Sequence, residues 1–324
     1  MAAALLSVAI LLGSAVSPAA AEEKTTASLR ILLKGEGELE VAPHGDGNVY
    51  AAEVHHHDGL YRMWYGGQGA DGHDRILYAV SDDGEAWTRK GVVIDNGDAN
   101  HVNDPTVAIV DGQYYMYYTR ATRDVIDRIC LATSNDGEHW KEHGIVVGAG
   151  PEGAWDAFSI GRPSVLYHEG RFHLWYDGRK DFPAGAPVKD VPLSANSRRA
   201  IGYATSRDGI HWQKHSANPV FGNNAGGIDV SLFEDRYLLF YESGRGTCLA
   251  ESPDGIHWED HGLFLPKTGE AEDQFGHVTP QLVVDDQTGD INLYVGAAPD
   301  RSWNKNQIGV FTIDREMLKR FLAR

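Results

Sequence analysis

The segment Ala200–Trp212 reads AIGYATSRDGIHW, and three other segments repeat its pattern. Each copy is a short apolar strand followed by S-x-D-G-x-x-W, and the other three copies end at Trp87, Trp140 and Trp258. The Asp and Gly are typical of a tight turn, and the Trp is large enough to fill the space between two sheets. Because the pattern recurs along the chain, it predicts a fold built from repeated β units.

Two further strands are expected ahead of each turn. The nearer one is rich in aromatic residues, as in QYYMYYTR (113–120) and RFHLWYDG (171–178). The farther one begins near a proline or an acid, as in NDPTVAIV (103–110). A fifth unit, over 277–314, has three such strands and lacks the Asp-Gly-Trp turn. Five units of three or four strands each predict an all-β fold, a five-bladed β-propeller.

The fifth unit lacks an outer strand. The N-terminal segment SLRILLKGEGELEVAP (28–43) resembles the missing strand, and its pairing there would remove an exposed sheet edge. The tail EMLKRFLAR (316–324) predicts a short helix on the outside. We therefore expect a single domain over residues 22–324, with blade five closed by an N-terminal strand.

Residues 1–21 are typical of a signal peptide. An apolar stretch from Ala3 to Leu12 is followed by small residues that end in Ala19-Ala20-Ala21, as signal peptidase prefers. The stretch departs from the usual pattern because no Lys or Arg precedes it, and it is too short for a membrane anchor. The sequence thus predicts a secreted or periplasmic protein without membrane insertion.

Charge and cysteine content limit the partners and the covalent cross-links. The chain has 29 Lys and Arg against 46 Asp and Glu, a net charge of −17, which disfavours nucleic acid and anionic membranes as partners. Its two cysteines cannot form a disulfide framework. Cys130 and Cys248 occupy the same position in units two and four, which are not neighbours in a ring of five. This spacing predicts two buried, unpaired thiols.

The starts of the innermost strands contain the candidate catalytic residues. Asp104 precedes a proline in unit two, and Glu53 and Asp229 follow the equivalent position in units one and four. Period-two alternation directs these side chains toward the central funnel, together with Arg162. Converging carboxylates suit glycosidic cleavage, in which one protonates the leaving oxygen and another activates water or attacks the sugar. Alternatively, these acids could accept strand-end amides or bind a central cation.

Two segments, HVNDPTVAIVDGQYYMYYT (101–119) and IGYATSRDGIHWQKHSANPVF (201–221), resemble the five-bladed glycosidases of glycoside hydrolase family 43. The invertase-type family 32 and the mannoside phosphorylases of family 130 share that architecture. The resemblance covers roughly residues 41–314. It implies a catalytic centre with a general base Asp, a pKa-tuning Asp and a general acid Glu, each at the start of an inner strand.

The catalytic residues of that family are matched only in part by this sequence. Asp104, in an Asp-Pro pair, matches the general base, and Asp229 could match the second Asp. The general acid of the family usually lies in a Glu-Gly-Pro or Glu-Ala-Pro stretch, and the nearest match here is Gly161-Arg162-Pro163. Glu53, or Glu242 at the end of an aromatic-rich strand, would have to act as the acid.

Further candidate substrate-binding residues lie on the same face. Arg179 begins a connection of about twenty residues, which is longer than its counterparts, and Asp156 precedes the inner strand of unit three. His277 precedes the inner strand of unit five, and the resemblance implies that it could help to hold a central ion such as Ca²⁺. Trp303 could stack on a sugar face. We expect no organic cofactor and no other metal site.

The expected function is that of a secreted glycoside hydrolase that cleaves an oligo- or polysaccharide with paired carboxylates. A phosphate-dependent glycoside phosphorylase is an alternative, because Arg162, Arg179, Lys180 and Arg245 could bind phosphate. A propeller that binds glycans without catalysis is the other. The sequence leaves the sugar, the linkage, the stereochemical course and the oligomeric state open.

Overall fold

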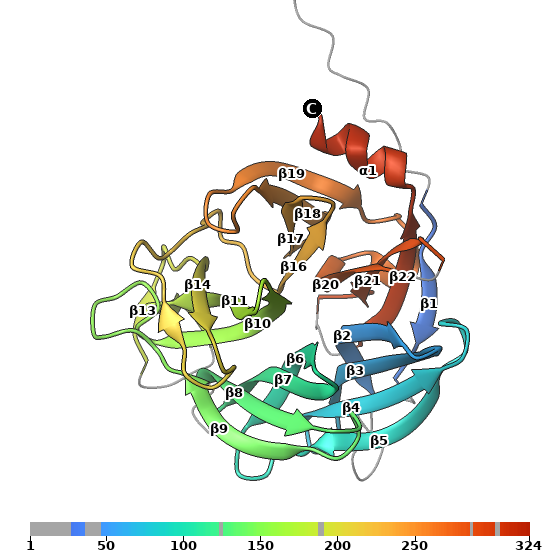
Figure 1. Cartoon of the computed structure of the whole chain (residues 1–324). Coiled ribbons are helices and arrows are strands. Elements are labelled where there is room, and N and C mark those ends of the chain that lie inside the picture. The colour runs from blue at the N-terminus through green and yellow to red at the C-terminus, as the bar shows by residue number, and fades with distance from the viewer. Residues whose placement is uncertain (1–26, 36–46, 123–125, 187–190, 286–287, 302–304) are drawn as a thin grey trace, which may run out of the picture.

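The computed structural model describes residues 27–35, 47–122, 126–186, 191–285, 288–301 and 305–324. The fold is all-β, and its sheets are arranged around a common centre that the chain circles in sequence order (Figure 1). The predicted signal segment 1–21 lies outside the described residues, so that expectation stays a prediction. Among the helices of the described ranges, none is long and apolar enough to cross a membrane.

Three sheets contain four antiparallel strands each, and we number them as units in chain order. Unit one comprises β2 (Asn48–His57), β3 (Leu60–Gln68), β4 (Asp74–Ser81) and β5 (Thr88–Ile94). Unit two comprises β6 (His101–Val110), β7 (Gln113–Ala121), β8 (Asp127–Ser134) and β9 (Lys141–Val147). Unit three comprises β10 (Ser159–His168), β11 (Arg171–Arg179), β14 (Ala200–Ser206) and β15 (Gln213–Lys214).

Two further groups of strands share one sheet, because Ser243 pairs with His277. Unit four comprises β16 (Ile228–Phe233), β17 (Arg236–Ser243), β18 (Gly246–Ser252) and β19 (Glu259–Pro266), and unit five comprises β20 (Gly276–Val284), β21 (Ile291–Ala298) and β22 (Gln307–Ile313). β1 (Arg30–Leu33) pairs antiparallel with β22, so an N-terminal strand lies at the outer edge of unit five.

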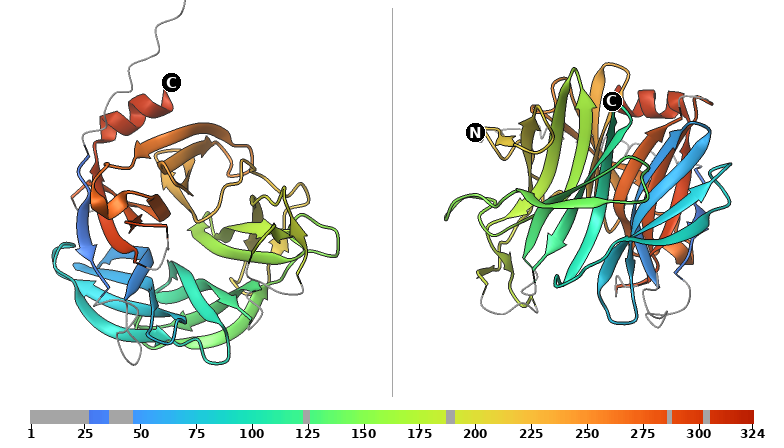
Figure 2. Two further views of the ribbon diagram at one scale, coloured as in Figure 1. Left: turned by 180° about the vertical axis from the view of Figure 1, so that it is seen from behind. Right: turned by 60° about the horizontal axis from the view of Figure 1, so that its bottom comes forward.

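The remaining elements are short. β12 (Phe182–Pro183) and β13 (Leu193–Ser194) form a small parallel pair within the connection from β11 to β14. The 3-10 helix η1 (Ala271–Asp273) precedes β20, and α1 (Arg315–Leu322) follows β22. Asp314 caps α1 by accepting a hydrogen bond from the amide of Met317, which satisfies a helix-end donor. The helix lies outside the ring of sheets in Figure 1 and in the left panel of Figure 2.

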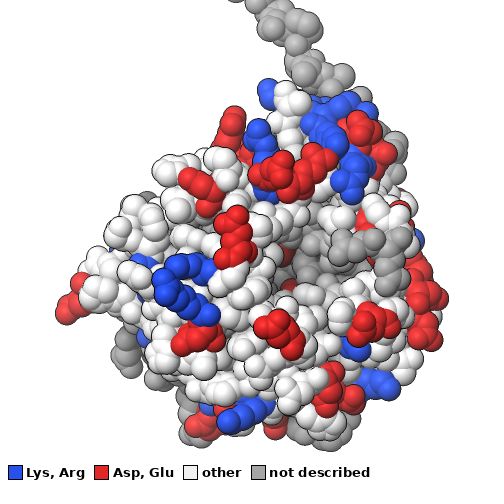
Figure 3. Space-filling view, in the orientation of Figure 1, with Lys and Arg blue, Asp and Glu red and all other residues white. Residues whose placement is uncertain are grey.

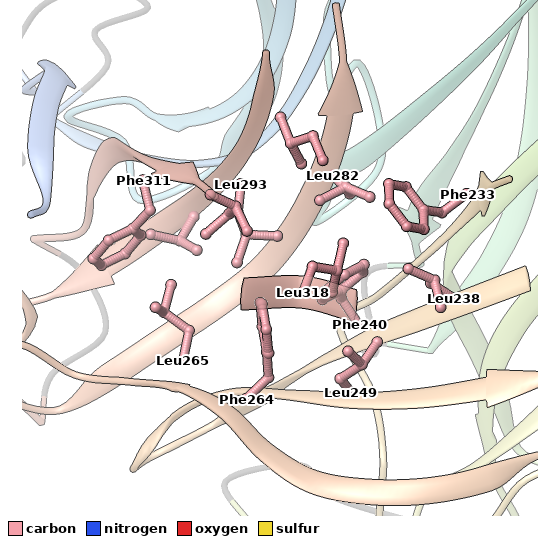
Figure 4. Close-up of a cluster of buried hydrophobic side chains, with 13 residues drawn as sticks. Phe233, Leu238, Phe240, Leu249, Phe264, Leu265, Leu282, Leu293, Phe311 and Leu318 are labelled. Atoms are coloured by element: carbon pink, nitrogen blue, oxygen red, sulfur yellow. The ribbon is translucent and has the colours of Figure 1, made fainter. Parts of the chain in front are cut away.

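The core consists of five clusters of buried apolar side chains, and each cluster joins two neighbouring units. The cluster between units four and five includes Phe240 of β17 and Phe311 of β22, and Leu318 of α1 completes it (Figure 4). The cluster between units five and one includes Tyr294 and Met63. The contacts between units therefore continue around the centre, back to the first unit.

The repeated S-x-D-G turns also connect neighbouring units. In unit two, the Ser134 hydroxyl accepts from the amide of Gly137, and the carbonyl of Gly137 accepts from the indole N–H of Trp64 in unit one at 2.8 Å. Equivalent bonds join Tyr117 to Gly209 and Trp175 to Gly255. The turns are therefore structural. The two cysteines are buried and unpaired, as predicted.

Candidate active site

The innermost strands are interrupted at equivalent positions. In β6 the register with β7 shifts between Asn103 and Thr106, and Asp104 has a φ of 49°. Ala51, Arg162 and Thr279 lie at the corresponding shifts in units one, three and five, with φ of 51°, 47° and 41°. A positive φ is uncommon for residues other than glycine. Each of these strands therefore contains a β-bulge, which redirects the side chains on either side of it.

The residues just after these bulges, together with Asp229 at the equivalent position of unit four, form a closed ring of hydrogen bonds. In each case the side chain of one inner strand accepts a bond from a backbone amide of a neighbouring inner strand. The five bonds run from the amide of Val107 to Glu53 (2.8 Å), Val165 to Thr106 (3.1 Å), Val230 to Ser164 (2.8 Å), Leu282 to Asp229 (3.0 Å) and Val54 to Gln281 (2.7 Å).

This ring accounts for two of the three predicted catalytic acids. The second oxygen of Glu53 accepts from the Gln281 amide, and its first oxygen also contacts His55. Asp229 accepts from the Ser231 hydroxyl as well, and burial, with the nearby charge of Glu53, raises its pKa to about 7. Both acids thus accept backbone amides, which is the structural alternative considered from the sequence. They lie at a narrow central space of about 30 Å³.

The third predicted acid, Asp104, lies at a much larger cavity of about 870 Å³ that residues from all five units line. Arg162, from the bulge of unit three, and Glu242, near the end of β17, also line it. Its wall is mainly polar; the other side chains that contribute charge or amide groups are Asn48, Gln68, Asp74, Asn103, Arg199, Asn223, Asn224, Arg245 and Asn306. Asp104 and Arg162 border both spaces, so they lie where the cavity narrows toward the centre.

Asp104 is buried, with 6% of the residue's surface exposed. Burial raises its pKa to about 6; the charges of Asp127 and Asp177 act in the same direction, and those of Arg162 and His101 oppose them. Among the described residues no hydrogen bond engages its carboxylate. A carboxyl group that borders a cavity and changes its charge near neutral pH is suited to proton transfer.

A chain of charged groups connects Asp104 with Glu242. Arg162 lies 3.3 Å from Asp177, and the charge of Asp177, followed by that of Asp104, raises the pKa of Arg162. Arg199 lies 3.7 Å from the other oxygen of Asp177 and donates a hydrogen bond to Glu242. Two guanidinium groups are therefore held between the carboxylates of the cavity wall. Figure 3 shows acidic and basic side chains interspersed over one face of the molecule.

A second polar group in the cavity wall was not predicted from the sequence. The Tyr50 hydroxyl donates to Asp74 at 2.8 Å and accepts from the Asn103 amide at 2.8 Å. Burial raises the pKa of Asp74. Asn103 precedes Asp104 in the quoted Asp-Pro segment, which could have drawn attention to it. Asp74 begins β4, and no local sequence pattern marks it.

The other predicted binding residues are placed differently. Asp156 is buried among its partners and accepts from Tyr176 (3.0 Å) and Lys214 (2.6 Å), and neither Asp156 nor Arg179 is among the cavity-lining residues. Arg179 lies beside Arg199, and its pKa is lowered by burial and by that charge. Trp303 lies outside the described residues. The substrate-binding role of each stays a prediction.

The residues present do not suit a central ion held by His277. This side chain borders the cavity but is fully buried, and its two ring nitrogens are engaged by Thr247 at 2.9 Å and Asp273 at 3.1 Å. In the described part of the chain, potential metal-ligand atoms of three residues come within 4.8 Å of one another at Glu251, Glu259 and His261. These three lie on β18 and β19 of unit four, and they do not border the cavity.

The sequence matches two family profiles. "Glycosyl hydrolases family 43" matches residues 99–257, and "Glycosyl hydrolases family 32 N-terminal domain" matches residues 38–159. Both matches include Asp104. The overlap of the two profiles agrees with the shared architecture that the resemblance implied.

Three curated relatives match parts of the chain. The arabinan endo-1,5-alpha-L-arabinosidase A of Aspergillus niger is 27% identical over 198 residues, which cover 58% of this chain and 55% of the relative. A beta-1,2-mannobiose phosphorylase of Thermoanaerobacter sp. is 36% identical over 107 residues, covering 31% and 35%. The protein Rv1502 of Mycobacterium tuberculosis is 35% identical over 131 residues, covering 37% and 43%. The chain thus matches from about a third to just over half of each relative's length.

Solved structures match over nearly the whole described chain. One is a glycoside hydrolase, with a TM-score of 0.67 and 18% identity, covering 86% of this chain and 92% of the other. Another is Zg3597, a family 117 glycoside hydrolase of Zobellia galactanivorans, with a TM-score of 0.66 and 18% identity, covering 88% and 90%. At this identity they show the fold alone. The chain is thus similar in sequence to the glycoside hydrolases of families 43 and 32 and in fold to the propeller glycosidases, which confirms the resemblance indicated by its repeats and its Asn103-Asp104-Pro105 segment.

Proposed function

We propose that this chain is a five-bladed β-propeller that hydrolyses glycosidic bonds in the 870 Å³ cavity. The five units, the five clusters between them and the closed ring of hydrogen bonds support the blade count. The pairing of β1 with β22 supports closure of blade five by the N-terminal strand. Residues 1–21 support a secreted or periplasmic location, where a polysaccharide or oligosaccharide is the substrate class that the related families suggest.

The observation that carries this proposal is the placement of Asp104 with Glu242 in one cavity. Glycoside hydrolysis needs one carboxyl group to donate a proton to the leaving oxygen and a second to activate water or attack the sugar. Two carboxylates from different units meet this requirement. Arg162, beside Asp104, adds a positive charge that stabilises the ionised form of that residue.

We assign the general base or nucleophile to Asp104. We assign the general acid to Glu242 in its protonated form, in which one carboxyl oxygen accepts from Arg199 and the other carries the proton. Asp104 matches the base of the resembled family, and its carboxylate has no hydrogen-bond partner within the described part of the chain. Glu242 is a candidate acid from the sequence that also borders the cavity, whereas both oxygens of Glu53 are engaged by other groups. Asp229 and Glu53 are assigned to the hydrogen-bond ring.

The test is a product assay on residues 22–324 with arabinans, xylans, fructans and mannans, each with and without inorganic phosphate. Asp104→Asn and Glu242→Gln should each lower product formation by about 100-fold or more, as loss of a general acid or base does. Asp235→Asn, at an exposed turn, serves as the control and should leave the rate unchanged. Full activity of Asp104→Asn would show that the catalytic assignment is wrong.

Phosphorolysis is the second candidate, and one observation favours it. Arg245 borders the cavity together with Arg162 and Arg199, and arginines bind phosphate through paired hydrogen bonds. Strict dependence on phosphate, with release of a sugar phosphate, would select this reaction over hydrolysis. Saturable glycan binding without any product would instead select a non-catalytic propeller.

A further inference from the structure

Arg199 ends the long connection between β11 and β14 and is fixed at both its backbone and its side chain. Its backbone amide donates to the Asn224 side chain at 2.9 Å. Its guanidinium donates to Glu242 and lies 3.7 Å from Asp177, and only 14% of the side chain is exposed. Glu242 itself is 19% exposed in its side chain, so this ion pair is largely shielded from water.

The backbone at Gly226 and Gly227 packs directly against this ion pair. A Cβ atom on Gly226 would lie 2.3 Å from a guanidinium nitrogen of Arg199, and one on Gly227 would lie 2.3 Å from a carboxylate oxygen of Glu242. Both distances are far shorter than a non-bonded carbon contact allows. The carbonyl of Gly226 also accepts from the amide of Glu242 at 3.2 Å. The glycine pair thus leaves the space in which the ends of these two side chains lie.

Asp177 joins this arrangement to the rest of the site. Its Oδ2 atom accepts from the amide of Gly227 at 3.3 Å and also faces Arg199. Arg162 donates to both oxygens of Asp177, at 3.3 Å and 3.4 Å. One nitrogen of Arg199, Nη1, therefore lies against two carboxylates from adjacent units. A lysine keeps the positive charge, but its ammonium lacks the other guanidinium atoms that pack against Gly226.

We propose that Arg199 is a positioning residue that holds the carboxyl group of Glu242 toward the cavity, and that Gly226 is required because any larger residue would displace the Arg199 guanidinium. The inference rests on the proposed function, since the acid role of Glu242 belongs to it. Arg199 acts through Glu242 and takes no part in bond cleavage. Misplacing a reacting group by about 1 Å can lower a rate by about 100-fold.

The first test compares Arg199→Gln and Arg199→Lys with wild type on a substrate that the wild-type protein cleaves. Arg199→Gln should lower kcat by about 100-fold with a change in KM within about threefold, because the binding surface persists while the reacting group moves. Arg199→Lys should recover only part of the loss. Thermal unfolding of each variant shows whether it is folded.

The second test moves the guanidinium without removing it. Gly226→Ala places a methyl group against Arg199. Gly222→Ala is the matched control, because it lies in the same connection between β15 and β16 and a Cβ there meets nothing within 4 Å. Gly226→Ala should show the kcat defect of the Arg199 variants, and Gly222→Ala should behave as wild type. The double variant Gly226→Ala/Arg199→Gln should be no slower than Arg199→Gln alone, since the two changes disturb one group.

The outcomes separate this inference from the proposed function. A wild type that cleaves no glycan overturns the proposed function and, with it, the role of Glu242 as an acid. If the wild type is active and the folded Arg199→Gln variant has the same kcat, the positioning role of Arg199 is overturned and the proposed function is not. A defect that appears only in KM also overturns it, because Arg199 would then bind substrate directly.

Discussion

The substitution Asp229→Asn distinguishes a residue of the hydrogen-bond ring from a catalytic acid. Asp229 has 9% of its surface exposed, and its carboxylate accepts from the amide of Leu282 and the hydroxyl of Ser231. An asparagine keeps one acceptor oxygen for the Leu282 amide and carries no charge. The variant should therefore fold and retain glycosidase activity, whereas a catalytic role would require a large loss.

The size of the effect on stability follows from the pKa. Burial raises the pKa of Asp229 to about 7, against about 3.9 in an unfolded chain. The folded protein thus binds this proton more tightly, so the stabilisation is complete below about pH 4 and is lost as the pH rises through about 7. Roughly 2–3 kcal/mol of the free energy of unfolding should disappear between about pH 5 and pH 8 from this residue.

Urea unfolding of both proteins at several pH values between about 5 and 8 measures this difference. The stability of Asp229→Asn relative to wild type should increase by roughly 2–3 kcal/mol over that range. Asp235→Asn should run parallel to wild type, because Asp235 is exposed. Parallel curves for Asp229→Asn, or a folded variant without activity, would refute the assignment of Asp229 to the ring.

Three further predictions concern the proposed catalytic carboxyl group, the contacts between units and the buried cysteine. Because the pKa of Asp104 is about 6 and the ionised form is the base, kcat/KM should rise with pH through about 6, and a profile that is flat there would contradict the assignment. Trp64→Ala should lower the free energy of unfolding by about 3–5 kcal/mol, because it removes a fully buried indole and its bond to Gly137; a urea-unfolding difference below about 1 kcal/mol would contradict this. Cys130, which is fully buried, should react with a thiol reagent only after unfolding, and a mass lower by two hydrogens would instead reveal a disulfide.

Most of the strand pattern could be predicted because it follows from local chemistry that repeats. The aromatic segment 113–120 forms β7 (Gln113–Ala121), and 103–110 lies within β6 (His101–Val110). The Asp-Gly turns have the expected tight geometry, with a positive φ at Gly137 and its equivalents. Repetition made each assignment more secure, since four copies of one turn define the strand boundaries together.

The direction of the inner-strand side chains could not be predicted in the same way. Simple alternation predicts that the residues before and after the bulge point to one side, which groups Asp104 with Glu53 and Asp229. The bulge instead directs Asp104 to the larger cavity and leaves Glu53 and Asp229 in the ring. Each bulge contains a residue with a positive φ, and a glycine at that position would have indicated the bulge from the sequence. In four of the units the residue is instead an alanine, an aspartate, an arginine or a threonine.

Contacts between distant segments explain the residues that sequence reasoning missed. Arg199 reaches Glu242 across 43 positions of the chain, and Asp74 meets Tyr50 across 24. Neither pair has a local signature, because an arginine at the end of a loop and an aspartate at a strand start are both common on solvated surfaces. Only the arrangement of the units around the centre brings them into the cavity wall.

The two positions on either side of the bulge also differ in what the fold requires of them. The five ring residues are Glu53, Thr106, Ser164, Asp229 and Gln281, which share an acceptor oxygen and little else, so any of several polar residues satisfies the ring. The bulge residues share no common hydrogen bond, and their side chains range from the methyl group of Ala51 to the guanidinium of Arg162. The fold thus sets the position of these side chains without setting their chemistry, which is why the bulge of unit two can present a carboxylate and that of unit three a cation to one cavity.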